Sequence, residues 1–131
     1  MAKPVVDVGL STFDGMSGRA RAIFDTGSHR SLIREDRVPV GATVARALTP
    51  LEFKTAAQGG KIHIVGALVL TITVGDRMIE DEVLVSPDLS QEMLIGAGTM
   101  QKWHIAILND NGHTEVVVGT DLRDPDVQEV D

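Results

Sequence analysis

Short runs in which large aliphatic residues alternate with smaller or polar ones follow one another along most of the chain. The clearest run, residues 68–74, reads Leu, Val, Leu, Thr, Ile, Thr and Val. Because successive side chains of a strand point to opposite faces, this pattern is typical of a strand with one face on a core. Similar runs predict further strands at 4–10, 19–24, 31–33, 51–55, 61–65, 78–85, 105–108 and 115–118.

Turn-forming residues separate the predicted strands. Asp-Gly-Met-Ser-Gly at 14–18 and Asn-Asp-Asn-Gly at 109–112 are typical of hairpin turns, where glycine and asparagine supply positive φ. Residues 38–50, interrupted by two prolines and a glycine, show no clear period. Residues 98–103 form the best helix candidate, and it is short. The pattern therefore predicts an all-β protein with one short helix near its C-terminal end.

Composition supports this class and excludes several kinds of chemistry. Hydrophobic residues make up 43% of the 131 residues and aromatic residues only 3%, so the core must rest on Val, Ile and Leu, which favours sheet. The absence of cysteine excludes a disulfide framework, a thiolate zinc site and a cysteine nucleophile. The length fits one domain, which we expect to span residues 1–119. Residues 120–131 hold five acids and no apolar period, so we predict a disordered acidic tail there.

The charge and hydropathy of the chain limit its partners. The net charge of −7 argues against nucleic acid, which requires a basic face. The longest apolar region, 62–74, is too short to cross a bilayer and is interrupted by threonine and glycine. No long apolar stretch follows the first residues, so no signal peptide is expected. We therefore expect a cytoplasmic protein without a membrane partner.

The strongest candidate for chemistry is Asp25, which follows the apolar residues 22–24 and begins the sequence Asp-Thr-Gly-Ser. A strand that runs into this segment delivers a carboxylate at the end of a buried element. The Thr26 hydroxyl can anchor the loop, Gly27 lets another backbone approach closely, and Ser28 can hydrogen-bond a carboxylate. The same tripeptide also fits a turn that caps a strand, so Asp25 alone does not establish a catalytic site.

A second motif lies downstream, Met-Leu-Ile-Gly at 93–96, just before the helix candidate and the apolar run at 105–108. Between the two motifs, residues 54–62 are rich in small residues and glycine. With these features in this order, the sequence resembles the retropepsin-like aspartic proteases. Subunits of that family carry an apolar-apolar-Asp-Thr-Gly-Ser/Ala loop, then a glycine-rich flap, then an apolar-apolar-Gly motif before a short helix. The resemblance covers roughly residues 5–108.

The resemblance implies both a fold and a function. The fold is a retropepsin-like closed β-barrel of short strands with a flap hairpin and one short C-terminal helix. The function is that of an aspartic endopeptidase working as a homodimer, in which each subunit gives Asp25 to a shared site. Two such carboxylates share one proton and activate a water molecule between them. The implied substrate is a peptide or protein, and no cofactor and no metal is implied.

The resemblance also assigns roles to the neighbouring residues. Thr26 would bond across the twofold axis to the partner's loop, Gly27 would offer backbone groups to the substrate, and Ser28 would lie near the outer oxygen of the carboxylate. Ile95 and Gly96 would pack beneath the Asp loop and support it. The substrate-binding flap would comprise Ala56, Ala57, Gln58, Gly59 and Gly60.

Other functions have less support in the sequence than this one. Gly96-Ala97-Gly98 lacks the third glycine of a dinucleotide-binding loop, because position 101 is Gln. The four histidines have no metal-ligand spacing, and only His29 is expected near the Asp loop. The Gly-x-Ser-x-Gly signature of serine hydrolysis does not occur. A retropepsin-fold dimerisation or peptide-binding module without catalytic activity stays open as the main alternative, and a plain β-barrel binding domain without a dimer as a further one.

Overall fold

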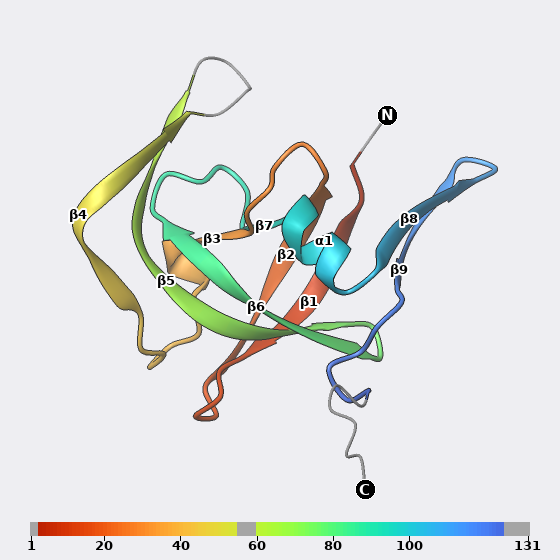
Figure 1. Ribbon diagram of the computed structural model, residues 1–131, viewed down its shortest axis with the longest axis horizontal. Helices are drawn as coiled ribbons and strands as arrows, with labels where there is room; N and C mark the ends of the chain where they lie inside the picture. The colour runs from red at the N-terminus through yellow and green to blue at the C-terminus, as the bar shows by residue number, and fades with distance from the viewer. Residues whose placement is uncertain (1–2, 55–59, 125–131) are drawn as a thin grey trace, which may run out of the picture.

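Strands dominate the computed structural model, which describes residues 3–54 and 60–124 (Figure 1). Along the chain they are β1 (Val5–Ser11), β2 (Ser17–Asp25), β3 (Leu32–Arg34), β4 (Ala45–Lys54), β5 (Lys61–Val74), β6 (Arg77–Ser86), β7 (Met93–Gly96), β8 (Ile105–Asp110) and β9 (His113–Val118). A 3-10 turn, Glu35–Arg37, follows β3, and the short helix α1 (Ala97–Lys102) follows β7. The predicted all-β class and short helix are confirmed. Within the described ranges, no helix has the length and apolar character needed to span a membrane.

The first seven strands form one sheet in the order β1-β2-β7-β3-β6-β5-β4. β1 pairs a second time, with β5, where Gly9 lies opposite Thr73. This second pairing closes the sheet into a barrel, as the resemblance implied. β4 lies outside the closure, along β5, at the left of Figure 1. β8 and β9 form a separate two-stranded sheet on the opposite side of the molecule.

Aliphatic side chains fill the barrel. In β5 the alternation places Leu68, Leu70, Ile72 and Val74 on the buried face. They belong to one cluster with buried residues from β1, β2, β6 and β7, which include Val8, Leu10, Phe24, Ile79, Val83, Val85, Met93 and Ile95. Burying each large aliphatic side chain of this kind contributes about 1.5–3 kcal/mol. The core therefore rests on Val, Ile and Leu, as the composition required.

β5 is one continuous strand of 14 residues, although the sequence predicted two strands at 61–65 and 68–74. The supposed break is Gly66, which remains inside the strand. A Cβ at this position would lie 2.6 Å from Val44 Cγ1 and 2.7 Å from the Ala45 carbonyl oxygen. The glycine therefore permits β4 to approach β5 closely, and it does not end the strand.

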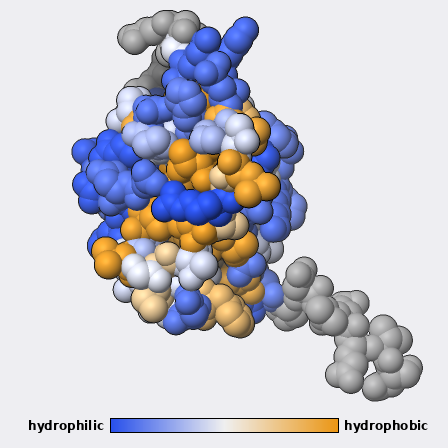
Figure 2. Space-filling view, turned by 90° about the vertical axis from the view of Figure 1, so that its left-hand side faces the viewer, coloured by the Kyte–Doolittle hydropathy of each residue, from blue (hydrophilic) through white to orange (hydrophobic). Residues whose placement is uncertain are grey.

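β4 covers residues for which the sequence showed no period, and it begins at Ala45 where the prediction began at residue 51. Its register shifts between Arg46 and Leu51, so Pro50 lies outside the hydrogen-bonded ladder, and an edge strand tolerates such a proline. The side chains of Leu48 and Leu51 are exposed. Figure 2 shows hydrophobic surface gathered in the middle of this side of the molecule.

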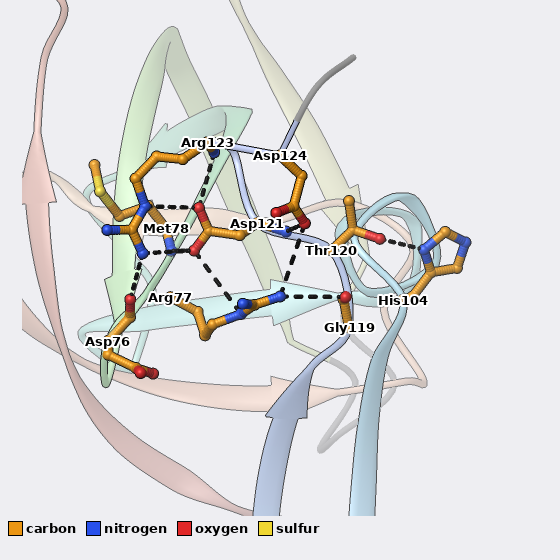
Figure 3. Close-up of polar contacts among 9 residues, drawn as sticks. All are labelled: Asp76, Arg77, Met78, His104, Gly119, Thr120, Asp121, Arg123 and Asp124. Carbon is orange, nitrogen blue, oxygen red and sulfur yellow. Dashed lines mark hydrogen bonds and ion pairs between the residues drawn. The ribbon is translucent and has the colours of Figure 1, made fainter.

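The chain remains packed beyond residue 119, where the sequence predicted the start of a disordered tail. The Asp121 carboxylate is 2% exposed and accepts hydrogen bonds from the Met78 amide at 2.8 Å and from Arg123 Nε at 2.9 Å (Figure 3). The Leu122 amide donates to the Met78 carbonyl. These contacts fasten residues 120–124 to the start of β6. The rest of the predicted tail, 125–131, lies outside the described residues.

The charge of Asp121 is held by its neighbours. The Arg123 guanidinium, the Arg123 amide and the Met78 amide hold the pKa of the Asp121 carboxyl well below its usual range. Arg77 lies on the other side of this carboxylate, with Nε at 3.8 Å from Oδ2 and Nη2 donating to the Gly119 carbonyl (Figure 3). Asp121, one of the five acids on which the predicted disordered tail rested, therefore anchors this segment to the start of β6.

Candidate active site

Asp25 is the last residue of β2, and it lies beside the second sequence motif. β2 and β7 run parallel, with Phe24 opposite Ile95 and Asp25 opposite Gly96. The Phe24 and Ile95 side chains are buried in the barrel, so the core fixes where both strands end. The two motifs, distant in sequence, thus meet at the point where each strand leaves the core. Ile95 and Gly96 thus lie beside the end of β2, and their support of the Asp loop stays a prediction.

Gly96 holds the loop after Asp25 at a distance that no other residue permits. A Cβ on Gly96 would lie 2.4 Å from the Arg30 carbonyl oxygen and 2.7 Å from the Ser28 carbonyl oxygen. Two amides of the β7–α1 junction also bind this loop: Ala97 donates to the Ser28 carbonyl at 2.6 Å and Gly98 to the His29 carbonyl at 2.9 Å. The loop is therefore fastened to the start of α1 through its backbone.

A relay of hydrogen bonds through the buried hydroxyls of Ser31 and Thr99 also holds the β7–α1 junction. The Thr99 hydroxyl donates to Asp81 Oδ2 at 2.6 Å and lies 2.6 Å from the Ser31 hydroxyl. Thr99 has a single hydroxyl proton, so Ser31 must donate to Thr99, and Ser31 in turn accepts from the Gly96 amide at 3.0 Å. Ser31 and Thr99 are each 2% exposed. Residue type does not signal this relay, since serine and threonine are mostly exposed in proteins.

The two oxygens of Asp25 have different partners. Oδ1 accepts from the Gly27 amide at 2.9 Å, which closes a tight turn within the loop. Oδ2 accepts from the Lys3 ammonium at 2.9 Å. Partial burial by itself raises the pKa of Asp25, but the hydrogen bonds from Lys3 and Gly27 outweigh it and lower the pKa below its ordinary value. Asp25 is therefore ionised and paired in the single chain.

Lys3 is the residue of this site that the sequence reading missed. It stands 22 positions before Asp25, in a segment that carries no motif. Its approach depends on β1, whose pairing with β2 places Val5 opposite Ile23 and so brings the preceding residues alongside the end of β2. Because such proximity follows from strand register, residue type alone does not indicate it.

The loop residues that follow Asp25 differ in their contacts. The Ser28 hydroxyl donates to the Arg30 carbonyl at 2.9 Å, so in the single chain it does not serve the Asp25 carboxylate, contrary to expectation. Its role there is to tighten the loop. Thr26 and Gly27 are exposed at the tip of the loop. His29 is exposed and its ring faces Gly98, close to the Asp loop as expected.

A groove of about 510 Å³ opens beside Asp25. Its apolar wall comes from the loop and barrel on one side and from the flap strands β4 and β5 on the other, through Ile23, Leu32, Phe53, Ile62, Leu89 and Leu94. Gly60 is the one predicted flap residue within the described ranges; Ala56, Ala57, Gln58 and Gly59 lie outside them. Its volume and apolar lining suit large side chains of a bound ligand.

Among the described residues, no three His, Asp or Glu side chains lie close enough together to hold a metal ion.

No family model matches the sequence, and no curated protein matches it. Among solved structures the chain is similar to the EIAV protease complexed with the inhibitor HBY-793, with a TM-score of 0.55 and 16% sequence identity. The match covers 82% of this chain and 94% of that protease. The chain therefore has the retropepsin-like all-β fold.

Proposed function

We propose that this chain is one subunit of a homodimeric aspartic endopeptidase that hydrolyses peptide bonds with the Asp25 carboxylates of two copies. The observation that carries the proposal is the place of Asp25. It stands at the end of a buried strand, opposite Gly96, and lines a groove of about 510 Å³. The retropepsin-like fold supports the same function.

The chemistry requires a second carboxylate. Asp25 is the one acid that lines the groove among the described residues. In the proposed dimer, an ionised Asp25 takes a proton from water as the water oxygen attacks the scissile carbonyl carbon, while the protonated Asp25 of the other copy gives its proton to the carbonyl oxygen. The resulting diol returns one hydroxyl proton to the second carboxylate. The first then protonates the nitrogen as the C–N bond breaks, so no covalent enzyme intermediate forms.

The β8–β9 hairpin offers a surface for the second copy. It pairs with no other strand among the described residues, and one of its faces packs on the barrel core through Ile105 and Val118. The other face carries Ala106 opposite Val117, with Leu108 next along the strand. Leu108 is 50% exposed and Val117 is 39% exposed. We propose that this face packs against its equivalent in the partner, because a twofold dimer uses the same patch on both subunits.

The Lys3–Asp25 ion pair favours one alternative, a peptide-binding module without catalysis. An Asp25 that keeps its ammonium partner is satisfied as an ion and has little tendency to share a proton. In the endopeptidase, Lys3 must therefore leave Oδ2 when the second carboxylate arrives. Peptide binding without hydrolysis would identify the module.

A peptide-library digest with the wild type and Asp25→Asn tests the proposal. We expect cleavage by the wild type and a loss on the order of a thousandfold or more in rate for Asp25→Asn, because the general base is removed while the shape is kept. Sedimentation and circular dichroism of the variant provide the control, since the fold should be unchanged and the dimer should form at least as readily as in the wild type. Near wild-type cleavage by Asp25→Asn would exclude Asp25 as the catalytic residue.

A further inference from the structure

The charge of the groove has the opposite sign to that of the chain. The whole chain carries −7. The lining of the groove carries the cations Lys3, Arg30 and Lys54 against the single carboxylate of Asp25. In the single chain Lys3 is paired with Asp25. Arg30 and Lys54 are the lining cations that this ion pair does not engage.

Both of these cations border the apolar wall. Arg30 precedes Leu32 by two residues at the exit of the Asp loop, and Lys54 directly follows Phe53 at the end of β4. The wall itself is the outer part of a cluster that contains Leu32, with Phe53 and Ile62 packed against it. A large side chain seated on this wall would thus have a cation near it on the loop side and another on the flap side.

Both cations retain N–H donors for a ligand carboxylate. Arg30 Nη2 donates to Glu82 Oε1 at 3.2 Å, but this is a single contact between exposed side chains. A guanidinium has five N–H donors, so most of the Arg30 fork remains available to a second carboxylate. Lys54 is exposed and has no carboxylate partner in the described part of the chain. Solvated lysine and arginine would be ordinary on the outer surface, but here both line a groove.

We infer that the groove selects acidic peptides, in which a large apolar residue has aspartate or glutamate within two positions of it. This inference rests on the proposed function and specifies its substrate class. The apolar residue packs on the wall formed by Leu32, Phe53 and Ile62, and the acidic side chains pair with Arg30 and Lys54. In a twofold dimer both cations occur twice, so acids are favoured on either side of the scissile bond.

The test uses three peptides that are identical except for glutamate, glutamine or lysine beside one central leucine. We expect kcat/KM of the wild type to be about two- to fivefold higher for glutamate than for glutamine per pairing charge, the scale of exposed ion pairs. The preference should shrink as salt is added. Arg30→Gln and Lys54→Gln should each bring the ratio closer to one, and Arg30→Glu should favour the lysine peptide. Arg19→Gln is the matched control, because it removes an exposed charge of β2 outside the groove.

Binding of the same labelled peptides to Asp25→Asn, followed by fluorescence anisotropy, separates this inference from the proposed function. Tighter binding of the glutamate peptide without cleavage by the wild type supports acidic selection and refutes the endopeptidase. Cleavage of all three peptides at equal rates, or a preference for lysine, overturns acidic selection and leaves the endopeptidase standing. If no peptide is bound or cleaved, both fail.

Discussion

Replacing Lys3 with methionine removes the ammonium from Asp25 Oδ2 and keeps most of the aliphatic stem. In the wild type the two groups are 2.9 Å apart, and the side chains are 56% and 16% exposed, respectively. Ion pairs exposed to this degree are screened by solvent and contribute about 0.2–1 kcal/mol. If Lys3 must leave Oδ2 when two Asp25 residues meet, each dimer forfeits two such contacts, or about 0.4–2 kcal/mol. Lys3→Met should therefore tighten the dimer about 2- to 30-fold.

The effect of Lys3 has a defined pH dependence. The pKa of Asp25 is lowered in the folded chain, with Lys3 as the strongest of the lowering contacts. A lowered carboxyl pKa means that the contact contributes fully above the ordinary value of about 3.9 and is lost as the pH falls through the depressed value. The Lys3 contact thus opposes the dimer most at neutral pH. The difference between wild type and Lys3→Met should shrink in acid.

Sedimentation velocity over a dilution series, at about pH 7 and at about pH 2, well below the ordinary carboxyl pKa, measures this difference. Lys3→Arg should behave like the wild type, because it keeps the charge at Oδ2. Arg19→Gln controls for the loss of one positive charge from an exposed position of β2. Equal dimer affinities for wild type and Lys3→Met at neutral pH would refute the reasoning, and so would a difference that grows in acid.

Three further substitutions test separate parts of the structure. Asp121→Ala should lower Tm, because the Met78 amide and the Arg123 guanidinium lose a buried acceptor. Since the pKa of Asp121 is lowered, the wild type should keep this advantage in Tm until strong acid, and a difference confined to alkaline pH would contradict the anchoring role. Gly96→Ala should lower the free energy of unfolding in urea by about 1–3 kcal/mol or more, because its Cβ would clash with the loop backbone. Gly9→Ala is the control, because its Cβ would make only ordinary contact with Thr73, and equal losses of stability would argue against the close approach at Gly96. Leu108→Glu should weaken the dimer at least tenfold in sedimentation, while Val69→Glu, at a comparably exposed position of β5, should not; equal effects would place the interface elsewhere.

The parts of the fold that could be predicted are those in which local pattern and tertiary structure agree. The alternation at 68–74 corresponds to the buried face of β5, and the two sequence motifs correspond to the adjacent ends of β2 and β7. The strand that was missed, 45–50 of β4, is an edge strand with a register shift, so neither its period nor its proline obeys the rule for a paired strand.

The parts that could not be predicted depend on where the fold brings distant residues. Lys3 reaches Asp25 through the register of β1 on β2, and Asp121 reaches Met78 through the return of the chain after β9. In sequence, Lys3 belongs to an unremarkable terminus and Asp121 to an acidic stretch. The relay from Gly96 through Ser31 and Thr99 is of the same kind, since only the packed structure orients its hydroxyls.

The central claim is that one active site is built from two chains, and mixed dimers test it most directly. Wild type and Asp25→Asn are unfolded together in equal amounts, refolded at a fixed total concentration, and assayed for peptide cleavage. With random pairing, about a quarter of the dimers hold two Asp25 carboxylates. If the site is shared, the mixture should have about a quarter of the activity of pure wild type at the same total protein concentration. About half of the pure wild-type activity would mean that each wild-type chain acts alone, and would contradict the shared site.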